Sequence, residues 1–149
     1  MGTVVHSDTH ISATTPYYRQ TMTAAASQPG RTASRPVVER LRALCLKLPE
    51  TSERSSWGHP NFRAGKKTFA AFEIIGGRPS IAFRLPPGEV DELVNSKDFF
   101  VTPYGRGLWV SLWVDGKIDW KRVDRLLHRS YRVVALKRML AALDNQPLP

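Results

Sequence analysis

The segment from Tyr104 to Arg138 restricts the fold of this chain more than any other part of the sequence. It begins with a largely apolar run, from Gly107 to Val114, in which both alternating sets of side chains are suited to burial. Because successive side chains of a strand point to opposite faces of a sheet, such a run is typical of a central or helix-covered strand. Asp115-Gly116 then supplies a turn, and Asp119 is placed to cap a following helix.

The helix predicted from Asp119 has an apolar side and a cationic side. At about 100° per residue, its apolar residues share one arc and the opposite arc is almost purely basic. The basic arc holds Lys121, Arg122, Arg125, His128, Arg129 and Arg132. Further along, from Leu136 onwards, apolar residues occupy the formerly basic side. One straight helix cannot bury both stripes, so we expect a bend or break between Ser130 and Ala135.

Shorter patterns predict the other elements. A helix is expected between Pro36 and Pro49, with Cys45 on its buried stripe, and the polar stretch from Pro49 to Ser56 is expected to be a loop. Strands follow, joined by tight glycine-containing turns. The first strand is expected to begin at Phe62, and the others to cover 69–75, 80–85, 99–102 and 107–114. A short helix is expected over 89–95. In strand 80–85, Ile81 and Phe83 are expected to point inward and Ser80 outward.

These elements predict an α+β fold. Strands joined by tight turns pair antiparallel, so we expect an antiparallel sheet of about four to five strands. An N-terminal helix, a short middle helix and a long or bent C-terminal helix should pack on that sheet.

A length of 149 residues predicts one domain with flanking segments. Residues 1–34 are rich in Thr, Ser and Ala without an apolar period, so a disordered leader is expected before a single domain over 35–145 and a tail over 146–149. Met22 is an alternative start, which leaves open whether residues 1–21 belong to the native protein. The single cysteine excludes an intramolecular disulfide, and no apolar run is long enough to cross a bilayer. We expect a cytoplasmic protein with no membrane partner.

The charge of the chain favours an anionic partner. Lys and Arg number 22 against 13 Asp and Glu, a formal net charge of +9. Nucleic acid, a phosphorylated ligand and an acidic protein surface all fit such a charge. The first candidate site is the basic helix face, formed by Lys121, Arg122, Arg125, Arg129 and Arg132, and the second is a set of turn cations, formed by Arg63, Lys66, Lys67, Arg78, Arg106 and Lys117. Both sets also fit ordinary solvated surface.

A third candidate site is an aromatic and cationic pocket. If Trp57, His59, Tyr104, Arg106 and Trp109 converge, they can stack on a base and bind its phosphate. The alternative is that His59 is a hydrogen-bonded structural residue and the tryptophans belong to the core.

Signatures of catalysis, metal binding and cofactor binding are lacking in the sequence. Gly105-Arg106-Gly107 is not a dinucleotide-binding fingerprint, because a third glycine is missing and a strand follows. The histidines have no metal-ligand spacing. Glu73 lies alone in an apolar strand, and one acid does not make an acid–base pair. No catalytic residue, metal or cofactor is therefore predicted.

Five short motifs resemble one known family. They are Leu48-Pro49, the segment from Trp57 to Phe62, the segment from Lys67 to Ala70, the segment from Gly107 to Ser111, and Ser130-Tyr131. In this order and spacing, over residues 36 to 143, they resemble the MmcQ/YjbR family of small bacterial proteins. The resemblance implies a compact α+β domain with a frataxin-like or double-wing arrangement. It also implies DNA binding, by which the family is described, and it brings no catalytic residue set.

Three functional hypotheses follow. The leading one is a non-enzymatic DNA-binding module, a monomer or weak dimer, that contacts phosphates through the basic helix face and the basic turns. The second is a protein-interaction module with an acidic partner. The third is a small-ligand or nucleotide-binding protein that uses the neighbourhood of His59, Tyr104 and Arg106.

Overall fold

The computed structural model describes residues 34–147. The predicted leader, apart from Ser34, and the last two residues of the predicted tail lie outside this range. The helices are α4 (Arg35–Leu46), α5 (Pro87–Leu93), α6 (Trp120–Val134) and α7 (Lys137–Asp144). The strands are β1 (Thr51–Ser56), β2 (His59–Ala64), β3 (Lys67–Ile75), β4 (Arg78–Arg84), β5 (Phe99–Val101) and β6 (Trp109–Trp113).

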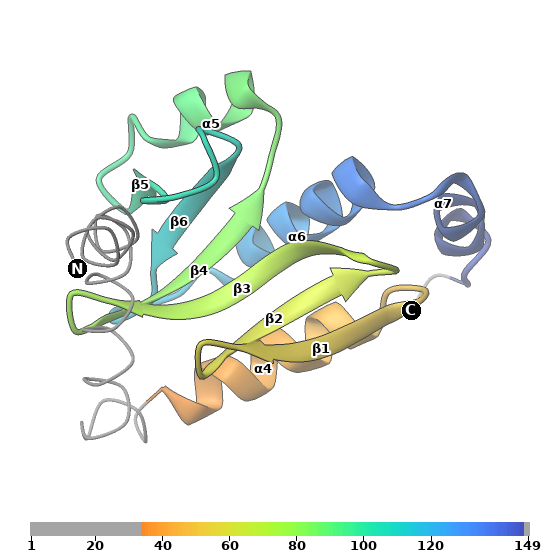
Figure 1. The fold of residues 1–149 in the computed structure, drawn as a ribbon, viewed down its shortest axis with the longest axis horizontal. Helices are drawn as coiled ribbons and strands as arrows, with labels where there is room; N and C mark the ends of the chain where they lie inside the picture. The colour runs from red at the N-terminus through yellow and green to blue at the C-terminus, as the bar shows by residue number, and fades with distance from the viewer. Residues whose placement is uncertain (1–33, 148–149) are drawn as a thin grey trace, which may run out of the picture.

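The strands form one antiparallel sheet in the order β1-β2-β3-β4-β6-β5. This confirms the predicted α+β class, with six strands rather than four to five. Strand β6 lies between β4 and β5, as its two apolar sides predict. Helices α4 and α6 both lie behind the sheet in Figure 1, so they cover the same face. The other face has no helix from the described part of the chain packed on it.

The additional strand is β1, in a stretch for which the sequence predicted a loop. Thr51–Ser56 is an edge strand whose side chains are mostly exposed, so it lacks the apolar alternation by which strands are recognised. Trp57 and Gly58 form the two-residue turn to β2, and their φ angles are 57° and 79°. Such turns favour Asn-Gly or Asp-Gly, because a bulky residue rarely adopts a left-handed φ. The Trp-Gly turn therefore concealed the hairpin.

The core lies between the sheet and its two covering helices. Strand residues Phe62, Ile81 and Phe83 are completely buried, and Leu127 and Tyr131 of α6 are buried against that side. The inward placement of Ile81 and Phe83 and the burial of Cys45 are confirmed. Ser80 lies on the opposite face, as predicted, but it is also fully buried, and its hydroxyl donates to the carbonyl oxygen of Glu73 at 3.3 Å.

The C-terminal helix breaks where its apolar stripe changes sides. Helix α6 begins after Asp119, whose carboxylate accepts from the backbone N–H of Arg122 at 3.2 Å, and it ends at Val134. Ala135 is extended and α7 starts at Lys137, so the predicted break is confirmed.

Helix α7 packs at the end of the sheet where β1 begins. The guanidinium of Arg138 donates to the carboxylate of Glu50 at 2.8 and 2.9 Å. The Met139 side chain is completely buried, and its methyl group lies 2.7 Å from where a Cβ on Gly65 would be. Helix α7 is therefore joined to the turn before β1 and to the turn after β2.

Candidate functional site

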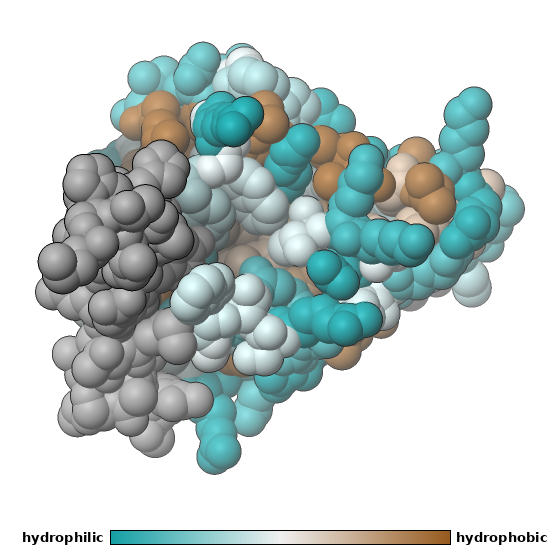
Figure 2. Space-filling view, viewed as in Figure 1, coloured by the Kyte–Doolittle hydropathy of each residue, from teal (hydrophilic) through white to brown (hydrophobic). Residues whose placement is uncertain are grey.

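We use the term open face for the side of the sheet opposite α4 and α6. Strand alternation and register assign alternate strand residues to it. Besides Ser56, His59, Ile75, Arg78 and Phe100, these include Ser52, Arg54, Asn61, Arg63, Ala71, Glu73, Ser80, Ala82, Arg84, Trp109, Ser111 and Trp113. Small side chains occupy the middle of the open face, and larger side chains lie around them. Figure 2 shows this side, where weakly polar surface surrounds a recess and hydrophilic side chains stand around it.

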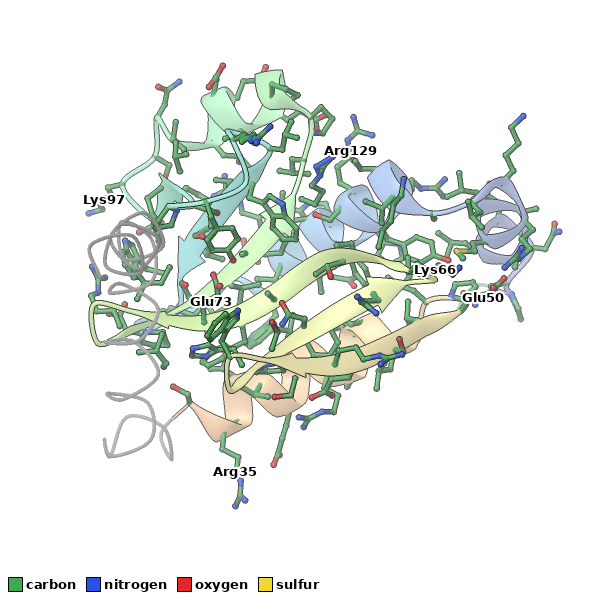
Figure 3. All side chains as sticks on the ribbon, viewed as in Figure 1. Arg35, Glu50, Lys66, Glu73, Lys97 and Arg129 are labelled. Carbon is green, nitrogen blue, oxygen red and sulfur yellow. The ribbon has the colours of Figure 1, made fainter. Side chains whose placement is uncertain are left out.

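The residue at the centre of the open face is Glu73. Its side chain stands on the near side of β3 in Figure 3, yet only 6% of the residue is exposed. Burial raises the pKa of this carboxyl to about 7, although the hydrogen bond from Tyr104 opposes the rise. The Tyr104 hydroxyl donates to Oε2 at 2.5 Å, whereas Oε1 has no hydrogen-bond partner within residues 34–147. Glu73 is therefore an acid that is about half protonated near neutral pH.

Tyr104 reaches Glu73 from the loop between β5 and β6. In the sheet, β4 and β6 separate β5 from β3, so the loop must carry Tyr104 across two strands. Gly105, Arg106 and Gly107 all have left-handed φ angles, of 85°, 54° and 78°. This confirms that Gly105-Arg106-Gly107 is a turn. A Cβ on Gly105 would come within 2.3 Å of the Trp109 ring, so only glycine fits there.

The predicted aromatic pocket is partly assembled. The Tyr104 and Trp109 rings lie with their centroids 6.4 Å apart, and the carboxylate of Glu73 is hydrogen-bonded to the Tyr104 hydroxyl. Trp57 is 57% exposed in the β1–β2 turn, and the buried His59 begins β2. Register pairs Asn61 with Ala71, so His59 and Glu73 both come two residues further along neighbouring strands. The alternative that the tryptophans belong to the core fails for Trp57.

Of the open-face arginines, Arg54, Arg63 and Arg84 make no ion pair with any residue of 34–147. The predicted turn cations Lys66, Lys67, Arg106 and Lys117 are all exposed, and Lys66 lies in the β2–β3 turn (Figure 3). Sequence reasoning omitted Arg54 and Arg84. The strand β1 that contains Arg54 was not predicted, and Arg84 looked like any solvated residue.

Arg78, another predicted turn cation, is already engaged. Its guanidinium donates to the Asp115 carboxylate at 2.6 Å and lies 4.0 Å from the centroid of the Trp113 ring. Phe100 stacks on the same ring at 4.1 Å. This cluster stiffens one end of the open face.

Two of the five cations on the basic face of α6 are engaged with acids of the same chain. Arg129 donates to both carboxylate oxygens of Glu89 in α5, and Arg132 donates to Asp144 of α7 at 2.7 Å. The Arg122 guanidinium lies 4.7 Å from the centroid of the Phe99 ring. Lys121 and Arg125 make no ion pair with a described residue. Because α6 packs on the opposite side of the sheet, its cations and those of the open face do not share one surface.

The part of the chain that the structure describes has neither a metal-ligand cluster nor a membrane-spanning helix. No group of three or more His, Cys, Asp or Glu side chains gathers there in a way that would hold a metal ion. No helix among residues 34–147 is long and apolar enough to span a bilayer.

These features define a class of protein: a small α+β domain with one helix-covered sheet face and one open face, which bears a buried acid among arginines and aromatic residues. The family model described as YjbR matches residues 46–133, and the chain belongs to the YjbR family. The resemblance found in the sequence motifs is thereby confirmed.

Two solved structures have a similar fold. The Deinococcus radiodurans protein DR2400, whose domain is described as DUF419, is 22% identical with a TM-score of 0.58, over 75% of this chain and 88% of that one. A Pseudomonas syringae protein is 17% identical with a TM-score of 0.55, over 64% of this chain and 96% of that one. At these identities the similarity concerns the fold alone. Among curated proteins there is no significant match.

Proposed function

We propose that this protein binds nucleic acid through the open face of its sheet, with a preference for single strands. The observation that carries the proposal is the state of the open-face arginines. Arg54, Arg63 and Arg84 have no acidic partner among residues 34–147, so their charges are available to phosphates. Lys66 and Lys67 extend this positive surface at the β2–β3 turn.

The electrostatics of the open face support a polyanionic ligand. Glu73 is the one acid among the strand residues assigned to that face. Its pKa of about 7 leaves the carboxyl about half neutral at physiological pH. Repulsion of phosphates by this acid is therefore reduced.

The aromatic residues favour a single strand over a duplex. Trp57 is 57% exposed at the edge of the open face, and Trp109 is partly exposed opposite Arg84. Unpaired bases stack on such rings with about 1–3 kcal/mol per base, whereas the bases of a duplex are already stacked. In this arrangement the rings bind bases and the arginines bind the intervening phosphates.

The basic face of α6, which the sequence predicted as the DNA surface together with the basic turns, receives a smaller part in this proposal. Its Arg129 and Arg132 would have to leave carboxylates of their own chain before binding phosphate. Lys121 and Arg125 remain as matched controls, since they are exposed cations without a described ion pair.

The test is fluorescence anisotropy of labelled oligonucleotides, single-stranded and duplex, titrated with the full chain over a salt series, with heparin as competitor. The double variant R54E/R63E is compared with K121E/R125E, which changes the net charge equally. We expect the sheet variant to lose about tenfold or more in affinity and the helix variant to lose less. With two to four phosphates bound, log affinity for a single strand should fall with log salt at a slope of about −1.4 to −2.8.

Two outcomes would contradict the proposal. A larger loss in K121E/R125E would assign the nucleic-acid surface to α6. If heparin competes equally well and all binding is lost near physiological salt, the positive charge binds any polyanion without specificity. The hypothesis of an acidic protein partner would then be favoured.

A further inference from the structure

A cavity of about 380 Å³ lies between the first turns of α4, the β1–β2 turn and β3. Its apolar wall is formed by Val38, Phe72 and Ile74. In β3, Phe72 and Ile74 alternate with Glu73, so this wall is on the helix-covered side, away from the open face. The volume falls within the range of about 300–1,000 Å³ that is usual for small-molecule sites.

Arg42 is held rigidly at this cavity. Its guanidinium donates to the two carboxylate oxygens of Glu53, with distances of 2.5 Å from Nε and 3.0 Å from Nη2. A guanidinium has five N–H donors in a fixed plane, so three remain for another acceptor. A donor group that is already oriented loses little conformational entropy when it binds an anion.

The remaining wall comes from the segment from Trp57 to Phe62, of which the proposed nucleic-acid surface uses only Trp57. Gly58 and His59 both line the cavity. A Cβ on Gly58 would meet nothing within 4 Å, so the backbone there borders open space. Trp57 is held at a left-handed φ of 57°, a conformation that is strained for a bulky residue and often marks a functional turn.

The charges around the cavity restrict its ligand. Arg35 and Arg42 line it, but so does Glu39, and Glu53 offsets the charge of Arg42. A polyanion would meet these acids, whereas one or two negative charges would meet the free donors of Arg42 and the exposed Arg35. Arg35 is only weakly held, with its Nε 4.0 Å from Glu39.

We propose that this cavity is a second binding site, for a small organic anion that carries one carboxylate or phosphate group. The anionic group binds the free donors of Arg42, and Arg35 closes over it. The organic part of the ligand rests against Val38, Phe72 and Ile74. This site adjoins the nucleic-acid surface at the β1–β2 turn, but Arg35 and Arg42 do not belong to that surface.

Amide NMR of the isotope-labelled full chain tests the proposal. The probes are benzoate, succinate, phenyl phosphate and inorganic phosphate, with benzamidine as a cationic control for benzoate. We expect saturable shifts of the Val38, Gly58 and Ile74 signals with at least one organic anion and none with benzamidine. Benzoate and phenyl phosphate distinguish the two anionic groups, and inorganic phosphate tests whether the organic part is needed.

Three variants separate the site from a general charge effect. R42K keeps the charge but lacks the planar fork, and it should weaken binding about tenfold or more. V38W fills the cavity and should abolish binding. The control R40K changes an arginine of the same helix that lies over the Trp120 ring, and it should bind normally.

The absence of saturable shifts with every anion would overturn the proposal, as would equal affinity in R42K and R40K. Retention of binding in V38W would place the anion elsewhere. If V38W does not fold, as judged by its NMR spectrum, the comparison of R42K with R40K decides alone. Oligonucleotide binding should be unchanged in R42K, so failure here and failure of the proposed nucleic-acid function can be distinguished.

Discussion

The basic side of α6 and the open face of the sheet carry the same kind of charge in different circumstances. On α6, Arg129 and Arg132 bind acids from α5 and α7, so these arginines hold the helices together. On the open face, Arg54, Arg63 and Arg84 have no such partners within residues 34–147. The comparison shows that a count of cations on a surface does not measure what that surface offers to a ligand. What matters is how many acids of the same chain have already bound them.

The two regions also differ in what fixes their geometry. Packing fixes the open face, where the Trp109 ring fills the space beside Gly105. On α6, exposed ion pairs hold the side chains of Arg129 and Arg132, and such pairs contribute about 0–1 kcal/mol each. Four changes test this difference.

The largest effect is expected from Gly105→Ala. The new methyl group would overlap the Trp109 ring, and alanine disfavours the φ of 85°. Strain and overpacking together should lower the free energy of unfolding by about 4 kcal/mol, measured by urea denaturation. Gly107→Ala is the matched control, because its φ is also left-handed but no atom lies within 4 Å of the added carbon. A loss equal to that of G107A would show that the Trp109 contact is unimportant.

The next largest effect is expected from Glu73→Gln, which should change how the free energy of unfolding depends on pH. The folded pKa of Glu73 is raised from 4.5 to about 7, so the folded chain binds the proton more tightly than the unfolded chain. The contribution of Glu73 to stability is therefore complete below pH 4.5, falls as pH rises towards 7, and is constant above that. Because glutamine stays neutral, E73Q should be more stable than the wild type at pH 8, by up to about 3 kcal/mol, with the difference shrinking towards pH 5.

Urea denaturation of both proteins from pH 5 to 8 measures this difference. Oligonucleotide affinity should fall more steeply with pH in the wild type than in E73Q. A stability difference that does not vary with pH would show that Glu73 does not titrate in this range.

A smaller effect on binding is expected from Trp57→Ala. The exposed ring contributes stacking of about 1–3 kcal/mol, so affinity for a single strand should fall roughly 5- to 150-fold. Duplex affinity should change less, because a duplex offers no unstacked base. Anisotropy with the two oligonucleotides gives both values, and W57F should restore most of the loss. Equal losses for single strand and duplex would argue against stacking.

The smallest effect is expected from Arg129→Gln. It removes an exposed ion pair with Glu89, so the free energy of unfolding should fall by less than about 1 kcal/mol. Nucleic-acid affinity should hardly change, because Arg129 is already bound to an acid. A tenfold loss of affinity in R129Q would show that phosphate displaces Glu89, and the distinction between the two surfaces would then fail.

Local sequence signals predicted much of the fold. Apolar alternation identified strand β6, the shift of the apolar stripe identified the break after Val134, and Asp119 was recognised as a cap. The exception was β1, whose polar edge residues and Trp-Gly turn resemble a loop. An edge strand is stabilised by hydrogen bonds to its neighbour, and those leave no apolar pattern in the sequence.

The candidate site was less predictable because its contacts are distant in sequence. Tyr104 and Glu73 were both noted, but they are 31 positions apart in the sequence, so the hydrogen bond that joins them could not be predicted. Arg129 and Glu89 are 40 residues apart, so the helix face looked uniformly available. The sequence identified the types of residue that bind anions, and only the fold identified which of them are already paired.

The position of α7 bears on when this domain can fold during synthesis. Met139 fills the space beside Gly65, and Arg138 binds Glu50. Residues near the end of the chain thus complete the packing of the first hairpins. On a ribosome, these hairpins emerge well before α7. Until α7 follows, the end of the sheet where β1 begins stays uncovered in the nascent chain. Folding of this domain should therefore finish only after residues 137–144 have left the exit tunnel, and its incomplete forms are the ones that a chaperone would meet.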